Sequence, residues 1–586
     1  MTCERYEINN KSFENGPLHI NNSGYYYFTE DIVLDFYNTQ EKFWAHQENN
    51  NFGFMAGIIV NACDVTIDLC GYSIQQSIRD FCLQRFFALI QLNNMPFIIG
   101  KGPILENRTE IIVPRNVIIK NGKFGLTSHQ AILGNKNDNL TLCDINVSNF
   151  EVTGITLNNV TNLKFHDSII HSANKNVPVS PFFSGFIFIY RLLMTTKTLT
   201  SDNEIKQRIQ IILDEIIEIL EEFIDIIFQM QSLDELYNLD DKFKFFINNK
   251  KLSPCNVQGI KITGSGPSVD EFHKSLNPDK SLNSKNIKIN NVIIKNICAS
   301  VDEELALAYN DKVVHLGAGV KGTFKFLENN DVYTILNLMK LLLNDYPSLN
   351  DYLKSDLIDD VVYDAVERIH LHKQLTDEES KVFSILRNVD SMGHINKGVV
   401  GARFGSTVEL NVKNLKIFNI VNNGKKSGLR FKLIHEYNIP KETYLDHGSN
   451  GLKNIVGSYS TGLIGSSIVD SCFKNIYICN IKSVHSEAIG VFVNNKSKNV
   501  TINDITIASI KSNEELGDSS VILIDENSKN IIVSKSFYNV NKQASNFRYI
   551  FLFFVSIVLM YIISLIPLST VISKFKLLFL RSKKIV

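Results

Sequence analysis

A short alternation of apolar and polar residues recurs along the chain at an interval near 23 residues. Asn139-Leu-Thr-Leu-Cys-Asp144 returns as Asn162-Leu-Lys-Phe-His-Asp167, and Asn116-Val-Ile-Ile-Lys-Asn121 stands one interval before them. Apolar residues at two-residue spacing predict a strand with one buried face. Asn or Asp five residues after the start predicts a tight turn, because both side chains can hydrogen-bond to the nearby backbone.

The same phrase begins at several other places. Its first residues are Asp64, Asn116, Asn139, Asn162, Asn286, Asn475, Asn499 and Asn530. A second apolar pair often follows the turn, and a third apolar stretch precedes the phrase, as in residues 131–133 and 154–157. Three such strands bury one shared apolar face only if the chain coils and successive coils stack in parallel. The pattern therefore predicts an all-β solenoid, a parallel β-helix, with the Asn column stacked into a ladder of side-chain amides.

Two helical patterns interrupt the strands and set the boundaries of the predicted segments. Ser201 to Glu204 is typical of a helix-capping box, and Ile209, Leu220 and Ile227 continue an apolar stripe behind it. The predicted segments are an N-terminal cap (1–56), β-helix rungs (57–176), a helical insertion (177–254), rungs (255–300), a second helical insertion (301–397), rungs (398–534), a linker (535–548), a transmembrane helix (549–568) and a basic tail (569–586). We expect the insertions to pack on the solenoid; docking of a protein partner is the alternative.

The sequence YIFLFFVSIVLMYIISLIPL, residues 549–568, contains no charged side chain. Its length matches a hydrocarbon core of about 30 Å, which predicts a single-pass membrane anchor in contact with the lipid bilayer. The N-terminus lacks the apolar stretch of a secretory signal. Insertion after synthesis would leave the β-helix on the cytosolic side, whereas the basic residues after the anchor favour the opposite orientation. We favour the cytosolic side.

Charge and cysteine content narrow the possible partners. The 586 residues carry a formal net charge of -1, so no basic excess favours nucleic acid as a partner. The 9 cysteines are scattered without a CxxC pair, which argues against a zinc site and is typical of reduced, buried thiols. We expect no metal and no cofactor.

Two N-terminal phrases point to a known family. "SGYYYFTEDIVL" (23–34), followed by "GIIVNACDVTIDLCGYSI" (57–74), resembles the entry of right-handed parallel β-helix, pectin lyase-like proteins. With the Asn, Ile and Lys bias, the long insertions and the tail anchor, the chain is similar to members found in mimivirus-like giant viruses. The resemblance implies the right-handed fold, whose enzymes act on polysaccharides; the same fold also hosts adhesins and tailspikes.

Enzymes of this fold imply a testable pattern of side chains. Hydrolases need paired carboxylates on adjacent rungs, and lyases need carboxylates for calcium with a basic residue. The outward positions two and four residues after each phrase start contain one carboxylate, Asp68. We expect Asp68 to have a structural hydrogen-bonding role. The catalytic residues therefore stay unknown at this point.

Other candidates are weaker. His166 and His171 share a rung, and His129 and Glu151 lie near it, so a site there is possible although solvated polar residues are the simpler interpretation. The pair His370 and His372 is spaced by two, which does not place both on one face of a helix. The glycine-rich stretches 264–268 and 315–322 match neither a P-loop nor a dinucleotide fingerprint, and both are interpreted as loops.

These observations favour a membrane-anchored β-helix protein with a structural or binding role and a glycan or protein partner. The alternative is a carbohydrate-active enzyme, a polysaccharide lyase or glycoside hydrolase, whose acids come from the insertions.

Overall fold

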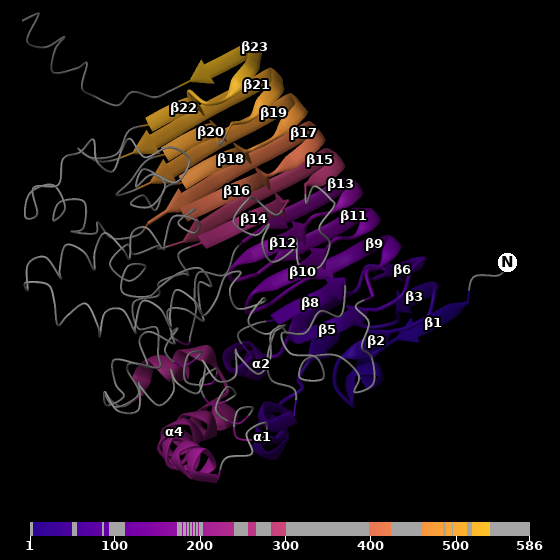
Figure 1. Cartoon of the computed structure of the whole chain (residues 1–586), viewed down its shortest axis with the longest axis vertical. Helices are drawn as coiled ribbons and strands as arrows, with labels where there is room; N and C mark the ends of the chain where they lie inside the picture. Colours follow the sequence, from indigo (N-terminus) through magenta and orange to yellow (C-terminus); the bar gives the residue numbers. More distant parts are fainter. Residues whose placement is uncertain are drawn as a thin grey trace, which may run out of the picture. The chain divides into compact units, whose positions relative to one another are not determined.

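The computed structural model describes residues 4–49, 55–84, 87–92, 112–172, 203–239, 256–264, 283–299, 398–423, 460–483, 488–494, 496–512 and 519–539, together with residues 179, 183, 187, 190, 194 and 197. These residues form two parallel sheets, and the chain passes from one to the other in every coil (Figure 1). The predicted parallel β-solenoid is thus confirmed.

The short-strand sheet has 10 strands. In stacking order they are β2 (Leu18–Ile20), β5 (Met55–Val60), β8 (Phe87–Leu92), β10 (Gln130–Asn135), β12 (Thr153–Asn158), β14 (Asn256–Thr263), β16 (Gly398–Gly405), β18 (Ser460–Ser466), β20 (Ala488–Asn494) and β22 (Ser519–Ile524). Their inward residues, such as Ile260 and Val491, are fully buried between the two sheets.

The long-strand sheet has 13 strands. Its main path is β1 (Arg5–Ile8), β3 (Gly24–Phe28), β6 (Val65–Asp68), β9 (Arg115–Phe124), β11 (Asp138–Ser148), β13 (Thr161–His171), β15 (Ser284–Ala299), β17 (Thr407–Asn422), β19 (Val469–Ser483), β21 (Lys498–Ser512) and β23 (Lys529–Asn539). Two further strands, β4 (Ile32–Leu34) and β7 (Ser73–Gln76), pair beside it. The segment predicted as a cap therefore contributes strands to the same two sheets.

The predicted turn is a bend inside one long strand. Asp144 and Asp167 have φ of 52° and 51°, which lets the chain turn while the pairing of β11 with β13 continues on both sides. This left-handed region suits Asn and Asp better than other residues that carry a Cβ. The two strands that the sequence predicted on either side of the turn are thus one strand.

The predicted amide ladder is present along the bends. Asn139 donates from Nδ2 to Oδ1 of Asn116 at 2.8 Å. Farther along, Asn480 donates to Asn419 at 2.7 Å, and Asn419 donates to Asn296 at 2.8 Å. Each rung thus satisfies the amide of the next, which favours stacking in register.

The predicted register was wrong at Asn475. Strands β15, β17, β19 and β21 bend three times at five-residue spacing, for example at Asp470, Asn475 and Asn480. Cys472 pairs with Thr501, so Asp470 is the residue in register with Asn499, and Asn475 belongs to the second bend. Because the phrase looks alike when shifted by five residues, only the pairing between strands fixes its position.

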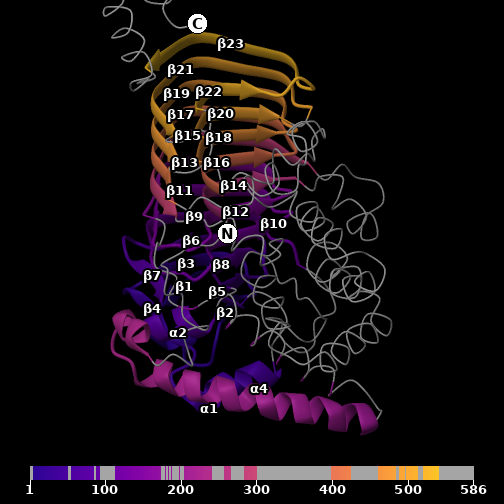
Figure 2. The same cartoon turned by 90° about the vertical axis from the view of Figure 1, so that its left-hand side faces the viewer.

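Three α-helices with described bounds lie in connections that lead to the short-strand sheet. They are α1 (Gln40–Asn49), α2 (Ile78–Leu83) and α4 (Asn203–Gln229), and single 3-10 turns occur at η1 (Asn10–Phe13) and η2 (Leu233–Asn238). Helix α4 of the first insertion contacts α1 and α2 (Figure 2). Its stripe residues Ile209, Leu220 and Ile227 are buried in the main core cluster. The expected packing of this insertion on the chain's own β-helix is confirmed for α4, and the structure adds that the contacts are with the N-terminal coils.

Several predicted segments lie outside the described residues. They include the second insertion (301–397), the membrane segment (549–568), the basic tail (569–586), and the motifs at 315–322 and His370 to His372. None of the helices that the structure describes has both the length and the apolar character needed to cross a bilayer. The membrane anchor and the segment boundaries stay predictions.

Candidate functional site

The carboxylate of Asp68 is the centre of a polar cluster on the long-strand sheet. It lies at the end of β6, in register with Tyr27 on one side and Lys120 on the other. Its side chain is only 6% exposed. Because Tyr27 and Lys120 in the same row are partly exposed, the outward position predicted for Asp68 is confirmed, and neighbouring side chains cover it.

Four groups contact this carboxylate. The Tyr25 hydroxyl donates to it at 2.5 Å and the Cys70 backbone N–H at 2.9 Å. Asn121 Nδ2 donates at 3.2 Å, and Lys120 Nζ forms an ion pair at 3.2 Å. The predicted structural role of Asp68 is confirmed, because these contacts join three successive strands of the sheet.

The cluster strongly shifts the titration of its members. Burial raises the pKa of Asp68, but the hydrogen bonds from Tyr25, Cys70, Lys120 and Asn121 outweigh it and hold the pKa at about 2. The hydrogen bond to Asp68, with burial, raises the pKa of Tyr25 to about 12. At neutral pH Asp68 is an anion and Tyr25 keeps its proton, so Asp68 has no proton to donate as a general acid.

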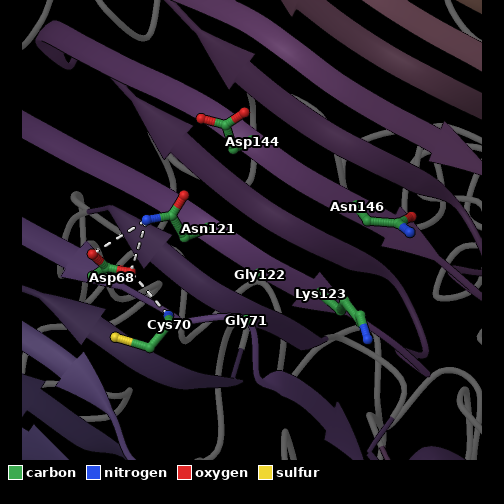
Figure 3. A pocket seen from close by; sticks show the side chains of 8 residues that line it. All are labelled: Asp68, Cys70, Gly71, Asn121, Gly122, Lys123, Asp144 and Asn146. Atoms are coloured by element: carbon green, nitrogen blue, oxygen red, sulfur yellow. Dashed lines mark hydrogen bonds between the residues drawn. The ribbon is translucent and has the colours of Figure 1, made fainter.

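A shallow cleft of about 570 Å³ opens beside this cluster. It is lined by Asp68, Cys70, Gly71, Asn121, Gly122, Lys123, Asp144 and Asn146. Figure 3 shows the Asn121 amide turned toward Asp68, with Asp144 contributed by the next coil. The lining offers carboxylate, ammonium and amide groups that could hold a hydroxyl-rich ligand, and the carboxylate of Asp68 is already engaged.

The four residues near the His166 rung separate into two places. His166 Nδ1 contacts Asp167 Oδ2 at 2.7 Å, and His171 Nδ1 contacts Ser172 Oγ at 2.9 Å, both on the long-strand sheet. His129 and Glu151 are buried in the connections just before β10 and β12 of the short-strand sheet. No group of three or more His, Cys, Asp or Glu that could hold a metal occurs among the residues described.

The outer face of the short-strand sheet carries buried polar side chains that lie outside the columns predicted from the sequence. The backbone carbonyl of His129 accepts hydrogen bonds at 3.1 Å from the N–H groups of Val152 and Thr153, which places Glu151 on the adjoining coil. Buried polar side chains continue along this face at Gln130 and Gln258. The sequence signal for these residues was the apolar stretch before each repeat, because polar residues that point outward alternate there with apolar residues that point into the core.

Comparisons with known proteins do not assign the chain to a family. No family model matches it, and no curated protein matches it. Similar solved structures include the A-module of the mannuronan C-5 epimerase AlgE4 from Azotobacter vinelandii, at TM-score 0.30 and 8% identity, covering 92% of this chain and 89% of that one. A polygalacturonase from Erwinia carotovora has TM-score 0.29 and 9% identity, covering 89% and 86%. The tailspike protein of the E. coli bacteriophage HK620, a mutant in complex with a pentasaccharide, has TM-score 0.24 and 8% identity, covering 88% and 60%.

These neighbours are parallel β-helix proteins of the pectin lyase-like kind. At such low TM-scores they carry no argument about activity, and the assignment of the fold rests on the strand pairing of this chain. The right-handed sense of the coil and the origin in a giant virus stay predictions.

Proposed function

We propose that this chain is a membrane-anchored binding module whose β-solenoid holds a glycan on its outer faces without cleaving it. The observation that carries the proposal is the state of Asp68. It is the single carboxylate at the outward positions two and four residues after each repeat start. It is also an anion held by four neighbouring groups.

A glycosidase needs two carboxyl groups, one that holds a proton as the general acid and one that acts as base or nucleophile. The cleft is lined by two carboxyl groups, Asp68 and Asp144. Asp68 has a pKa of about 2, far below the pKa that suits a general acid at neutral pH. Its closest charged neighbour is Lys120, at 3.2 Å, which further stabilises the anion. These properties favour binding over hydrolysis on the long-strand sheet.

The anchor is the second part of the proposal. Residues 549–568 would hold the solenoid at a bilayer, with the β-helix on the cytosolic side. A solenoid tethered in this way would present its faces repeatedly to a polymer, so modest affinity at each site would suffice for retention.

The experiment is a panel of neutral, carboxylated and sulfated polysaccharides incubated with the full-length chain in mild detergent. Retention on the immobilised polymer and release of reducing ends are measured on the same samples. Retention without cleavage is expected. Cleavage would overturn the binding assignment, and lack of retention on every polymer would overturn the glycan ligand.

A carbohydrate-active enzyme is the second candidate, and one observation favours it. Glu151 is a fully buried acid two residues before β12, beside the coil that carries the buried His129. If the panel reveals cleavage, Glu151→Gln should abolish it, whereas Asp68→Asn should leave the cleavage rate within about twofold wherever the protein folds.

A further inference from the structure

The outer face of the long-strand sheet is rich in lysine from β13 to β21. Outward strand positions on these five strands carry Lys164, Lys288, Lys295, Lys413, Lys416, Lys474, Lys482 and Lys511. None of the five strands contains arginine. The chain as a whole is almost neutral, so this face concentrates positive charge.

The acids of the same strands are confined to the bends. They are Asp167, Glu409, Asp470 and Asp504, with φ between 49° and 58°. Asp470 Oδ1 accepts a hydrogen bond from Asn499 Nδ2 at 2.8 Å. Glu409 Oε1 forms an ion pair with Lys285 Nζ at 3.6 Å. The flat stretches between bends therefore keep their lysines without an acidic neighbour on the same stretch.

Two aromatic rings lie within this positive field. Phe418 and Tyr477 have ring centroids 5.4 Å apart at an interplanar angle of 43°, and both are half-buried on the outer face. Lys416 is in register with Tyr477, and Lys413 is in register with Lys474. We call Lys413, Lys416, Phe418, Lys474, Tyr477 and Lys482 the lysine–aromatic patch.

The patch offers donors and apolar ring surface but few acceptors. The side-chain oxygens of Asn414 and Asn419, at the adjoining bends, already accept amides from Asn475 and Asn480 at 2.6 and 2.7 Å. A glycan rich in free hydroxyls needs acceptors as well as donors, whereas a sulfated glycan presents mainly acceptor oxygens. Neighbouring strands lie about 4.8 Å apart, so lysines in register form rows along the stack of coils.

We propose that the lysine–aromatic patch binds a sulfated polysaccharide that runs along the stack of coils, an inference that rests on the proposed glycan-binding function. The ammonium groups neutralise the sulfates, and the two rings pack against the C–H faces of the sugars. Duplex DNA fits less well, because arginine is the preferred partner for bidentate phosphate contact and a flat sheet face offers no element to enter a groove.

The test is calorimetric titration of the full-length chain in detergent with dextran sulfate, with uncharged dextran as the matched ligand. Polygalacturonate and a DNA duplex are the competing polyanions. The patch variant is Lys413→Glu, Lys416→Glu and Lys474→Glu together, and the control variant is Lys11→Glu, Lys42→Glu and Lys206→Glu together. The neutral set Lys413→Gln, Lys416→Gln and Lys474→Gln replaces the patch variant if the latter does not fold.

Dextran sulfate should bind and uncharged dextran should not. The affinity for dextran sulfate should fall steeply as salt is raised from about 50 to about 300 mM, as is usual for binding to a polyanion. The patch variant should lose at least tenfold in affinity, while the control variant stays within about threefold of the native chain. Tyr477→Thr, which carries the residue found at the same position of the next coil, should weaken binding of dextran sulfate more than binding of DNA.

Equal losses in the patch and control variants would overturn the patch and leave a glycan-binding function standing. Tighter binding of DNA or polygalacturonate than of dextran sulfate would overturn the ligand class. Failure of the native chain to bind any polysaccharide would overturn the proposed function as well.

Discussion

The hydroxyl of Tyr25 donates a hydrogen bond of 2.5 Å to the carboxylate of Asp68, 43 residues later in the chain. Tyr25 lies on β3 and Asp68 on β6, so the bond joins two successive coils near the N-terminal end of the solenoid. The contact turns the one outward carboxylate of the predicted columns into a structural anion. It also couples the stability of the first coils to pH.

Tyr25→Phe should destabilise these coils at pH 7 by about 1.5–3 kcal/mol, the usual contribution of a hydrogen bond to a charged group. The pKa of Asp68 is lowered to about 2 in the folded chain, so its stabilising contribution is complete above the unfolded pKa near 4 and is lost as pH falls toward 2. In Tyr25→Phe the free energy of unfolding should fall less as pH is lowered, because the hydrogen bond from Tyr25 no longer lowers the pKa of Asp68. Denaturant unfolding at a series of pH values measures both effects, with Tyr27→Phe as the control, and equal stability of the two variants would contradict the assignment.

A buried carboxyl, Asp80, should give the opposite pH dependence. Burial raises the pKa of Asp80 to about 7, although the backbone N–H groups of Phe36 and Tyr37 donate to it at 2.8 and 3.1 Å. A raised folded-state pKa means that the folded chain retains the proton more strongly than the unfolded chain. The free energy of unfolding should therefore fall as pH rises from about 4 to about 7, with a slope approaching about 1.4 kcal/mol per pH unit.

Asp80→Asn should remove this slope because the amide does not titrate. Trp44 is the single tryptophan of the chain and packs against Phe43 and Tyr190 in the same N-terminal region, so its fluorescence can follow the unfolding. The control is Asp144→Asn, which changes an exposed carboxyl group. It should keep the native dependence of the free energy of unfolding on pH. A slope unchanged in Asp80→Asn would show that another group is responsible.

The amide ladder allows one destabilising and one stabilising substitution to be compared. Asn419→Ala should lose the hydrogen bonds to Asn296 and from Asn480. It also leaves at φ 56° a residue that tolerates the left-handed region less well than asparagine, and the total cost should be about 2–3 kcal/mol. Asn419→Gly should be about 1 kcal/mol more stable than Asn419→Ala, because glycine adopts a positive φ without backbone strain. Ser509, at φ 59° in register with Asn480, should accept asparagine, and Ser509→Asn should stabilise the chain by about 0.5–1.5 kcal/mol. Thermal unfolding compares all three with the native chain.

The fold could be predicted because its signal repeats locally. The two-residue alternation and the Asn or Asp five residues later are properties of one rung, and each rung must match its neighbours to stack. The same repetition produced the error at Asn475, since a strand that bends at residues 470, 475 and 480 resembles itself after a shift of five. The pairing between strands, such as that of Cys472 with Thr501, distinguishes the two registers.

The site around Asp68 and the buried Asp80 were less predictable because their contacts are distant in sequence or made by the backbone. Asp80 is held by backbone N–H groups more than 40 residues away, and a backbone donor leaves no residue-type signature. The expected role of Asp68 followed from its phrase, but Tyr25 and Lys120 as its partners required the register between coils. The lysine–aromatic patch likewise appears only when the rows of separate coils are aligned.

The membrane anchor is open to a direct test that does not depend on the solenoid. The full-length chain expressed in cells should pellet with membranes and resist extraction by alkaline carbonate, because residues 549–568 match the thickness of the hydrocarbon core. Val555→Lys with Met560→Lys should release the protein, since each buried charge costs about 2.5–3.5 kcal/mol on insertion scales. The matched control places the same charges in the linker, as Asn541→Lys with Asn546→Lys, and should stay in the membrane pellet. Protease added to sealed vesicles with the cytosolic side outward should degrade the solenoid, and protection of the solenoid would place it on the other side.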